Sequence, residues 1–125
     1  MARNVAYWVS TVLVVALSVF AGFVYLSGGP KAVQGFVHVG YPQQLRVLLG
    51  IGKVLGGMTL IAPRLGRLKE WAYAGFTFTW IAAFVAHYLA KDGPVAYAPL
   101  ILLAFLAVSY LTRPASRQWP LKAVS

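Results

Sequence analysis

The chain has 125 residues, of which 60% are hydrophobic and only 10% are charged, and its mean hydropathy is +0.73. Soluble domains carry about 25% charged residues, so a soluble fold is excluded and lipid is the expected solvent. The net charge of +9 is typical of basic membrane-protein loops, and no aromatic–basic platform for nucleic acid is visible. The absence of cysteine excludes disulfides, thiolate metal sites and thiol redox chemistry.

The hydropathy pattern predicts an all-α integral membrane protein, an antiparallel bundle of four transmembrane helices in a single membrane domain (1–125). A span needs about 20 mostly apolar residues, and four segments qualify: residues 5–26, 44–62, 70–90 and 95–112. The first segment resembles a signal peptide after Arg3, but its apolar run is too long and no small-residue cleavage site follows. We therefore expect it to be retained as a helix.

The connection between the first two spans, residues 27–43, is too long for a turn and too apolar for a solvated loop. Two interpretations fit: a short helix lying in the outer interface, or a re-entrant segment that dips back between the helices. This outer segment contains His38 and Tyr41, which we include among the candidate site residues.

The distribution of basic residues predicts which end of the bundle faces the cytoplasm. One side is expected to carry Arg3, Arg64, Arg67, Lys69, Arg113, Arg117 and Lys122. The other side carries Lys31, Lys91 and Arg46 at a helix end. Because basic residues concentrate in cytoplasmic loops, both termini and the tail 113–125 are expected in the cytoplasm.

Lys53 lies within the second span, in "RVLLGIGKVLGGMTL" (46–60). At a rise of 1.5 Å per residue from Gln44, it falls about 13 Å into a hydrocarbon core of about 30 Å. A lysine at that depth costs roughly 3 kcal/mol on helix-insertion scales. It shares a helical stripe with Arg46, Gly50 and Gly57, and small residues let helices approach closely, so the stripe should face the bundle. Either Lys53 snorkels toward an interface, or it points inward and holds a ligand.

The third span offers polar groups at the depth of Lys53. Thr77, Thr79 and Trp80 are level with it, and they could supply a hydroxyl or a cation–π face. Glu70 lies about 13 Å nearer the cytoplasm, so neither acid of the chain is placed to neutralise Lys53. A bound anionic or carbonyl-bearing ligand would do so. The candidate ligand-binding residues are Lys53, Thr77, Thr79, Trp80 and Gly57.

A second group of candidates consists of Glu70, Tyr73 and His87, with polar or acid–base roles. Glu70 also suits the start of a helix, where an acid complements the dipole, and His87 suits an interfacial histidine bonded to a loop. His38 and His87 lie at the same outer end and are expected to approach each other. Paired axial ligation of a haem by these histidines is a less favoured alternative, and we predict no metal site.

The stretches "GYP", "LGIGKVLGG" and "LIAPRLGRLKEWAYAGFTFTW", followed by "AH" (within 40–87), resemble the DoxX-like family of small four-helix bacterial membrane proteins. The resemblance implies a polar residue at Lys53, the Lys69-Glu70-Trp71 turn and a histidine at His87. Many members carry an Asp where Thr79 stands and a Gly where Ala82 stands, and this chain departs from both. The family implies the bacterial cytoplasmic (inner) membrane, and some relatives are linked to thiosulfate:quinone oxidoreduction or redox stress.

These observations lead to a functional hypothesis and three alternatives. The first is a subunit or accessory of a membrane redox system that binds a lipophilic molecule, with quinone as the candidate ligand, beside Lys53. The alternatives are a membrane scaffold or assembly protein without catalysis, a small transporter, and a membrane isomerase or hydrolase of a hydrophobic substrate. Expected partners are the lipid bilayer, with a membrane protein or a second copy of the chain, and no nucleic acid.

Overall fold

The computed structural model describes residues 2–63 and 65–114, and these residues form helices joined by short turns. The elements are α1 (Ala2–Ser27), α2 (Pro30–His38), α3 (Gln43–Ile61), α4 (Gly66–Leu89), the 3₁₀ helix η1 (Gly93–Tyr97) and α5 (Ala98–Leu111). Three segments are long and apolar enough to cross a membrane: α1, α3 and the continuous η1–α5. The prediction of an all-helical, membrane-type chain is confirmed to that extent. Helix α4 has a similar length, but its Thr, Tyr, Trp and His residues lower its mean hydropathy.

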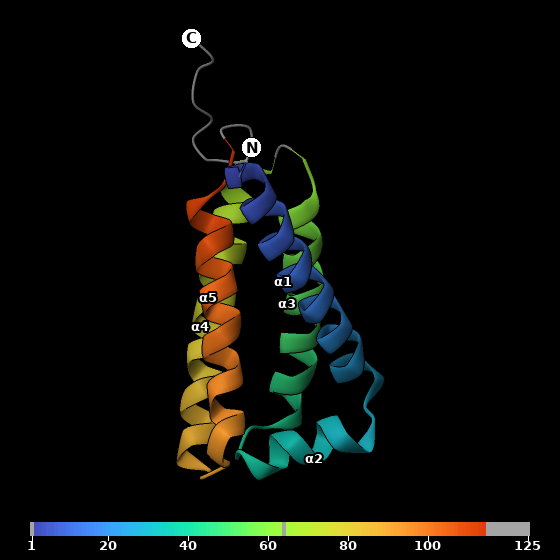
Figure 1. The fold of residues 1–125 in the computed structure, drawn as a ribbon. Helices are drawn as coiled ribbons and strands as arrows, with labels where there is room; N and C mark the ends of the chain where they lie inside the picture. Colours follow the sequence, from blue (N-terminus) through green and yellow to red (C-terminus); the bar gives the residue numbers. More distant parts are fainter. Residues whose placement is uncertain (1, 64, 115–125) are drawn as a thin grey trace.

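The four long helices lie side by side in two pairs, and α2 lies across one end of them (Figure 1). Helix α1 packs against α3 and α5, and α4 packs against α5 and α3. At the end opposite α2, where α1 begins and α5 ends, the guanidinium of Arg3 donates hydrogen bonds to the carbonyls of Leu111, Thr112 and Arg113. Arg3 thereby satisfies carbonyls at a helix C-terminus that have no partner within the helix.

The segment between α1 and α3 forms α2, with Pro30 in its first turn, where a missing amide proton is tolerated. Its inward face buries Ala32 and Phe36, which are four residues apart. Gly40, with a φ of 81°, permits the turn that leads into α3. This segment therefore closes one end of the pair formed by α1 and α3.

Helix α4 begins at Gly66, one turn before the predicted start at Glu70. The cause is Lys69, which the sequence pattern places among the loop charges but which is only 1% exposed. Its ammonium donates to the Ala62 carbonyl at the end of α3, and its amide donates to the Leu65 carbonyl at 2.8 Å. Lys69 thus caps α3 while it extends α4 backward. The predicted last span, 95–112, is divided into η1 and α5, and Pro99 lies in the first turn of α5.

Glycines bring α1 and α3 into backbone contact. A Cβ added to Gly22 would lie 2.6 Å from Val54 Cγ2 and 2.8 Å from the Gly50 carbonyl oxygen. A Cβ on Gly50 would lie 2.9 Å from Leu26 Cγ, and one on Gly57 would lie 2.7 Å from Val19 Cγ2. The predicted small-residue stripe of α3 is therefore an internal packing face against α1.

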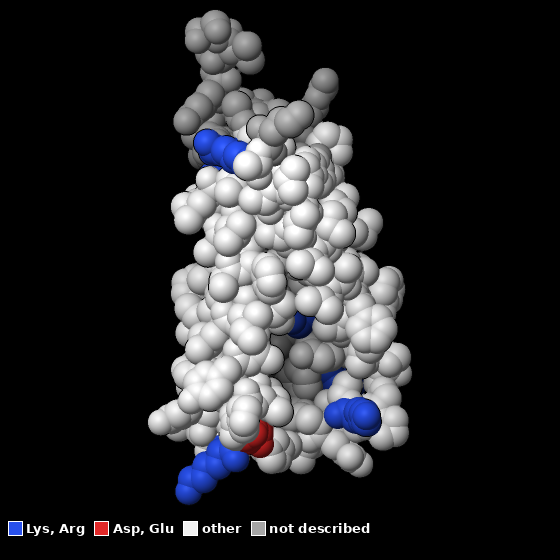
Figure 2. Space-filling model, viewed as in Figure 1, with Lys and Arg blue, Asp and Glu red and all other residues white. Residues whose placement is uncertain are grey.

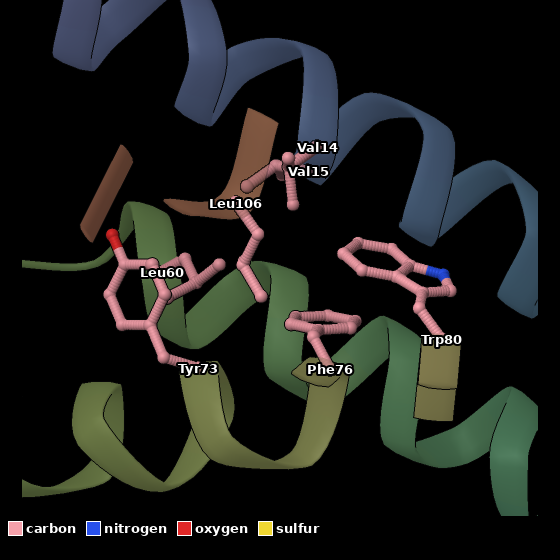
Figure 3. Close-up of a cluster of buried hydrophobic side chains, with 7 residues drawn as sticks. All are labelled: Val14, Val15, Leu60, Tyr73, Phe76, Trp80 and Leu106. Atoms are coloured by element: carbon pink, nitrogen blue, oxygen red, sulfur yellow. The ribbon is translucent and has the colours of Figure 1, made fainter. Parts of the chain in front are cut away.

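A buried apolar cluster joins the two pairs of helices (Figure 3). Its members are Val14, Val15, Leu60, Tyr73, Phe76, Trp80 and Leu106. Phe76 and Trp80 stack with ring centroids 5.1 Å apart. Beside this cluster the Ser109 hydroxyl bonds to Thr11 and to Tyr73, each at 2.6 Å, so α1, α4 and α5 are joined through one hydroxyl. Hydrogen bonds of this kind hold helices together in lipid.

Substitution at two of the glycines tests the contact between α1 and α3. We expect Gly22→Ala to lower the free energy of unfolding by about 1–3 kcal/mol, because the new methyl group meets backbone that has no room to yield. Gly52→Ala is the matched control, since its Cβ would meet no atom within 4 Å. The measurement is thermal unfolding of both variants in detergent. Equal midpoints for the two variants would contradict the packing described.

Candidate functional site

A cavity of about 690 Å³ lies between the helix pairs at the end closed by α2. All of the helices contribute to its lining, including Tyr25, Phe36, Leu49, Lys53, Trp80 and Leu102. Figure 2 shows a hollow in this half of the molecule, and blue atoms of Lys or Arg are visible inside it. The lining is mostly apolar, which suits a lipophilic molecule.

Lys53 is the buried charged residue of the cavity, with 7% of its surface exposed. Its ammonium nitrogen lies 5.5 Å from the centroid of the Tyr25 ring and 5.6 Å from that of the Trp80 ring. Two aromatic faces at this distance attract a cation. They do not replace the oxygen or nitrogen acceptors with which the three ammonium donors of a lysine form hydrogen bonds. Within the part of the chain that the structure describes, Lys53 has neither a hydrogen bond nor an ion pair. Its donors are therefore available to a ligand.

The packing of α3 determines where Lys53 points. Gly50 and Gly57 flank it on the same helical face and lie against α1. The lysine between them consequently enters the space enclosed by α1, α3 and α4 and does not extend into lipid. Tyr25 lies near the end of α1. Its contact with Lys53 depends on the crossing of α1 and α3, for which the sequence carries no local signal.

The other predicted ligand-binding residues divide into two groups. Thr79 and Trp80 line the cavity together with Lys53. Thr77 does not line it, and its hydroxyl donates to the Tyr73 carbonyl at 2.7 Å. Gly57 is likewise absent from the lining, because it packs against Val19 of α1. Thr77 and Gly57 lie at about the depth of Lys53 along their helices, but they are on helix faces that do not line the cavity.

The structure brings the two histidines to one carboxylate at the α2 end. Asp92 accepts from His38 Nε2 at 2.6 Å and from His87 Nδ1 at 2.6 Å. His38 belongs to α2 and His87 to α4, so this triad ties the helix that closes the cavity to the opposite pair. The hydrogen bonds from His87 and then His38 hold the pKa of Asp92 below its ordinary value. His87 and Tyr41 also line the cavity, and the Tyr41 hydroxyl donates to the Ala82 carbonyl at 3.4 Å.

Glu70 belongs to a different group at the opposite end of α4. It accepts from Arg113 at 2.5 Å and from the Tyr110 hydroxyl at 2.9 Å. Along the axis of α4, Glu70 and His87 are about 25 Å apart, so they do not face one substrate. Tyr73 belongs to the hydroxyl contact with Ser109. Among the residues that the structure describes, no group of three or more His, Cys, Asp or Glu is placed to hold a metal ion.

A family model matches residues 9–109 of this chain, which include every residue that lines the cavity, and it describes the DoxX-like family. The chain belongs to the DoxX-like family. The resemblance drawn from the sequence is confirmed, and the DoxX-like match includes Tyr25, Lys53, Trp80 and Asp92. Comparison with curated proteins and with solved structures found no match.

The triad gives a prediction with a definite dependence on pH. Because the pKa of Asp92 is lowered in the folded protein, its contribution to stability is present above the unfolded pKa and is lost as pH falls through the folded pKa. Asp92→Asn should therefore reduce the thermal midpoint at about pH 7, and the difference from wild type should shrink near pH 3. The measurement is thermal unfolding of both proteins in detergent across this range. A difference that does not change with pH would show that the charge of Asp92 has no role.

Proposed function

We propose that this DoxX-like protein is an antiparallel bundle of four transmembrane helices, with α4 as the remaining span and α2 as an interfacial helix. Helix α4 has 24 residues, or about 36 Å, which exceeds the hydrocarbon thickness of about 30 Å. It also packs between α3 and α5, so its polar groups are supported by protein contacts.

The proposed orientation has both termini in the cytoplasm of a bacterial inner membrane. Arg3, Arg67 and Arg113 support it, because they gather at the end opposite α2 and basic residues favour the cytoplasmic side. The α2 end carries Lys31, Arg46 and Lys91 together with the triad of His38, Asp92 and His87. Among the described residues it therefore has fewer Lys and Arg than the other end, which carries Arg3, Arg67, Lys69 and Arg113. Arg64, Arg117 and Lys122, and the predicted tail beyond residue 114, lie outside the described residues.

We propose further that the cavity binds a lipophilic molecule with an electron-rich carbonyl, such as a quinone. The observation that carries this proposal is the buried ammonium of Lys53, which faces the cavity and makes no hydrogen bond within the described residues. A lysine at this depth costs roughly 3 kcal/mol, and a ligand carbonyl would accept from it directly. The volume of about 690 Å³ lies in the usual range for small-molecule sites, about 300–1,000 Å³.

The proposed role is that of a subunit or accessory in a membrane redox system. The chain has no cysteine, and its two histidines are both bonded to Asp92, so the bound molecule would carry the electrons. Lys53 would orient the carbonyl and stabilise negative charge on its oxygen. Trp80 and Tyr25 would form the walls on either side.

Other observations disfavour the remaining hypotheses. A scaffold that used the Gly50 and Gly57 face of α3 for its partner is disfavoured, because this face already packs against α1. An isomerase or hydrolase that used Glu70 and His87 needs both in one pocket, and they lie at opposite ends of α4. A small transporter of the multidrug type relies on an acid within α1, and α1 contains none.

The experiment is to purify the protein in mild detergent, extract it with organic solvent and analyse the extract by mass spectrometry. We expect a stoichiometric lipophile in the wild-type protein and about a tenfold loss in Lys53→Met, because a hydrogen bond from a charged group is removed. Lys31→Met is the matched control, since Lys31 lines the same cavity but is exposed.

Thermal unfolding of the same samples provides the second readout. Lys53→Met should be more stable than the wild-type protein once both are stripped of lipid, because a thioether has no charge to desolvate. If Lys53→Met retains the full amount of lipophile, the proposed role of Lys53 is wrong. If the wild-type protein contains no lipophile, the proposed ligand is wrong.

A further inference from the structure

A second hollow, of about 260 Å³, lies between α3 and α4 on the other side of Lys53. Its lining combines glycines of both helices, Gly52, Gly56 and Gly75, with the apolar side chains of Leu68 and Trp71. Leu49, Lys53 and Thr79 line both this hollow and the larger cavity. The two spaces therefore meet at these three side chains.

The polar groups of the site stand at this junction. No hydrogen bond of the Thr79 hydroxyl occurs within the described residues, as is also true of the Lys53 ammonium. Since Thr79 and Lys53 line the same two spaces, a hydroxyl and an ammonium are both available there to donate to a ligand acceptor. An acceptor held at the junction has apolar space on both sides.

The small hollow has the character of a subsite. Its volume is below the range of about 300–1,000 Å³ typical of a whole ligand site. A Cβ at Gly52 or Gly75 would meet no atom within 4 Å, and both glycines are exposed, so the hollow is open at the surface of the bundle. The helices there are not held apart by bulky groups, so the space suits one short apolar arm.

We propose that the ligand is a two-armed lipophile whose hydrogen-bond acceptor lies inside the molecule, between a longer and a shorter apolar arm. The acceptor binds Lys53 and Thr79, the longer arm occupies the large cavity, and the shorter arm occupies the hollow between α3 and α4. This inference rests on the proposed function and narrows its ligand class. It disfavours molecules with a terminal polar group, such as fatty acids, which would leave the hollow empty.

Two ketones of identical formula test the inference directly. Diheptyl ketone carries its carbonyl in the middle, and methyl tridecyl ketone carries it near one end, so their total apolar content is equal. The full-length protein in detergent is mixed with equal amounts of the two, one of them deuterated, and native mass spectrometry gives the bound ratio. We expect the wild-type protein to favour diheptyl ketone about tenfold, because two or so further methylenes are buried.

Filling the hollow should abolish this preference without disturbing the fold. Gly52→Leu and Gly75→Leu place side chains in open space, replace a poor helix former and should bring the bound ratio close to one. Gly35→Leu is the matched control, because Gly35 lines only the large cavity and its Cβ would also meet no atom within 4 Å. It should reduce binding of both ketones and leave their ratio unchanged.

The outcomes separate this inference from the proposed function. A ratio that Gly52→Leu and Gly75→Leu leave unchanged, with both ketones still lost in Lys53→Met, would overturn the two-armed ligand and retain the site at Lys53. A wild-type preference for methyl tridecyl ketone would have the same meaning. If neither ketone binds the wild-type protein, both proposals are overturned.

Discussion

The contact of α1 with α3 through glycine determines the shape of the rest of the molecule. Gly22 and Gly50 bring the two backbones together near α2. In this half of the molecule α1 therefore packs against α3 and lies away from α5. At the other end, Thr11 meets Ser109 at 2.6 Å and returns α1 to the opposite pair. The helices are thus joined at one end and separated at the other, and the cavity is the space that this divergence leaves (Figure 1).

The acids with ionic partners lie at the two ends of the bundle, and Lys53, which has no ionic partner among the described residues, lies between them. Glu70 with Arg113, and Asp92 with the two histidines, lie at opposite ends, where water and lipid headgroups screen what remains of their charge. Lys53 lies between these groups, with the rings of Tyr25 and Trp80 near its ammonium. A charge in a medium of low dielectric interacts strongly with any acceptor that enters. The same isolation that makes Lys53 unfavourable in the empty protein is what would make it an effective group in the proposed site.

The sequence predicted features that depend on a single helix and missed those that depend on how helices cross. Hydropathy located the long segments, and the helical rise placed Lys53 with Thr79 and Trp80, because both properties are local. The same arithmetic included Thr77, whose face turns from the cavity. It also left Lys69 in a loop, although its ammonium reaches back to Ala62 at the end of α3. Tyr25 was missed because only tertiary packing brings it to Lys53.

The bonds from Arg3 to the end of α5 have a consequence for the order of assembly during synthesis. They join residues up to 110 positions apart, so they form only after Arg113 has left the ribosome. The residues of α1 and α3 are synthesised before those of α4 and α5. At the stage before α4 and α5 are added, the side of Lys53 that these helices line in the folded protein has no helix against it. A lipophile present at that stage would be enclosed as the last helix arrives.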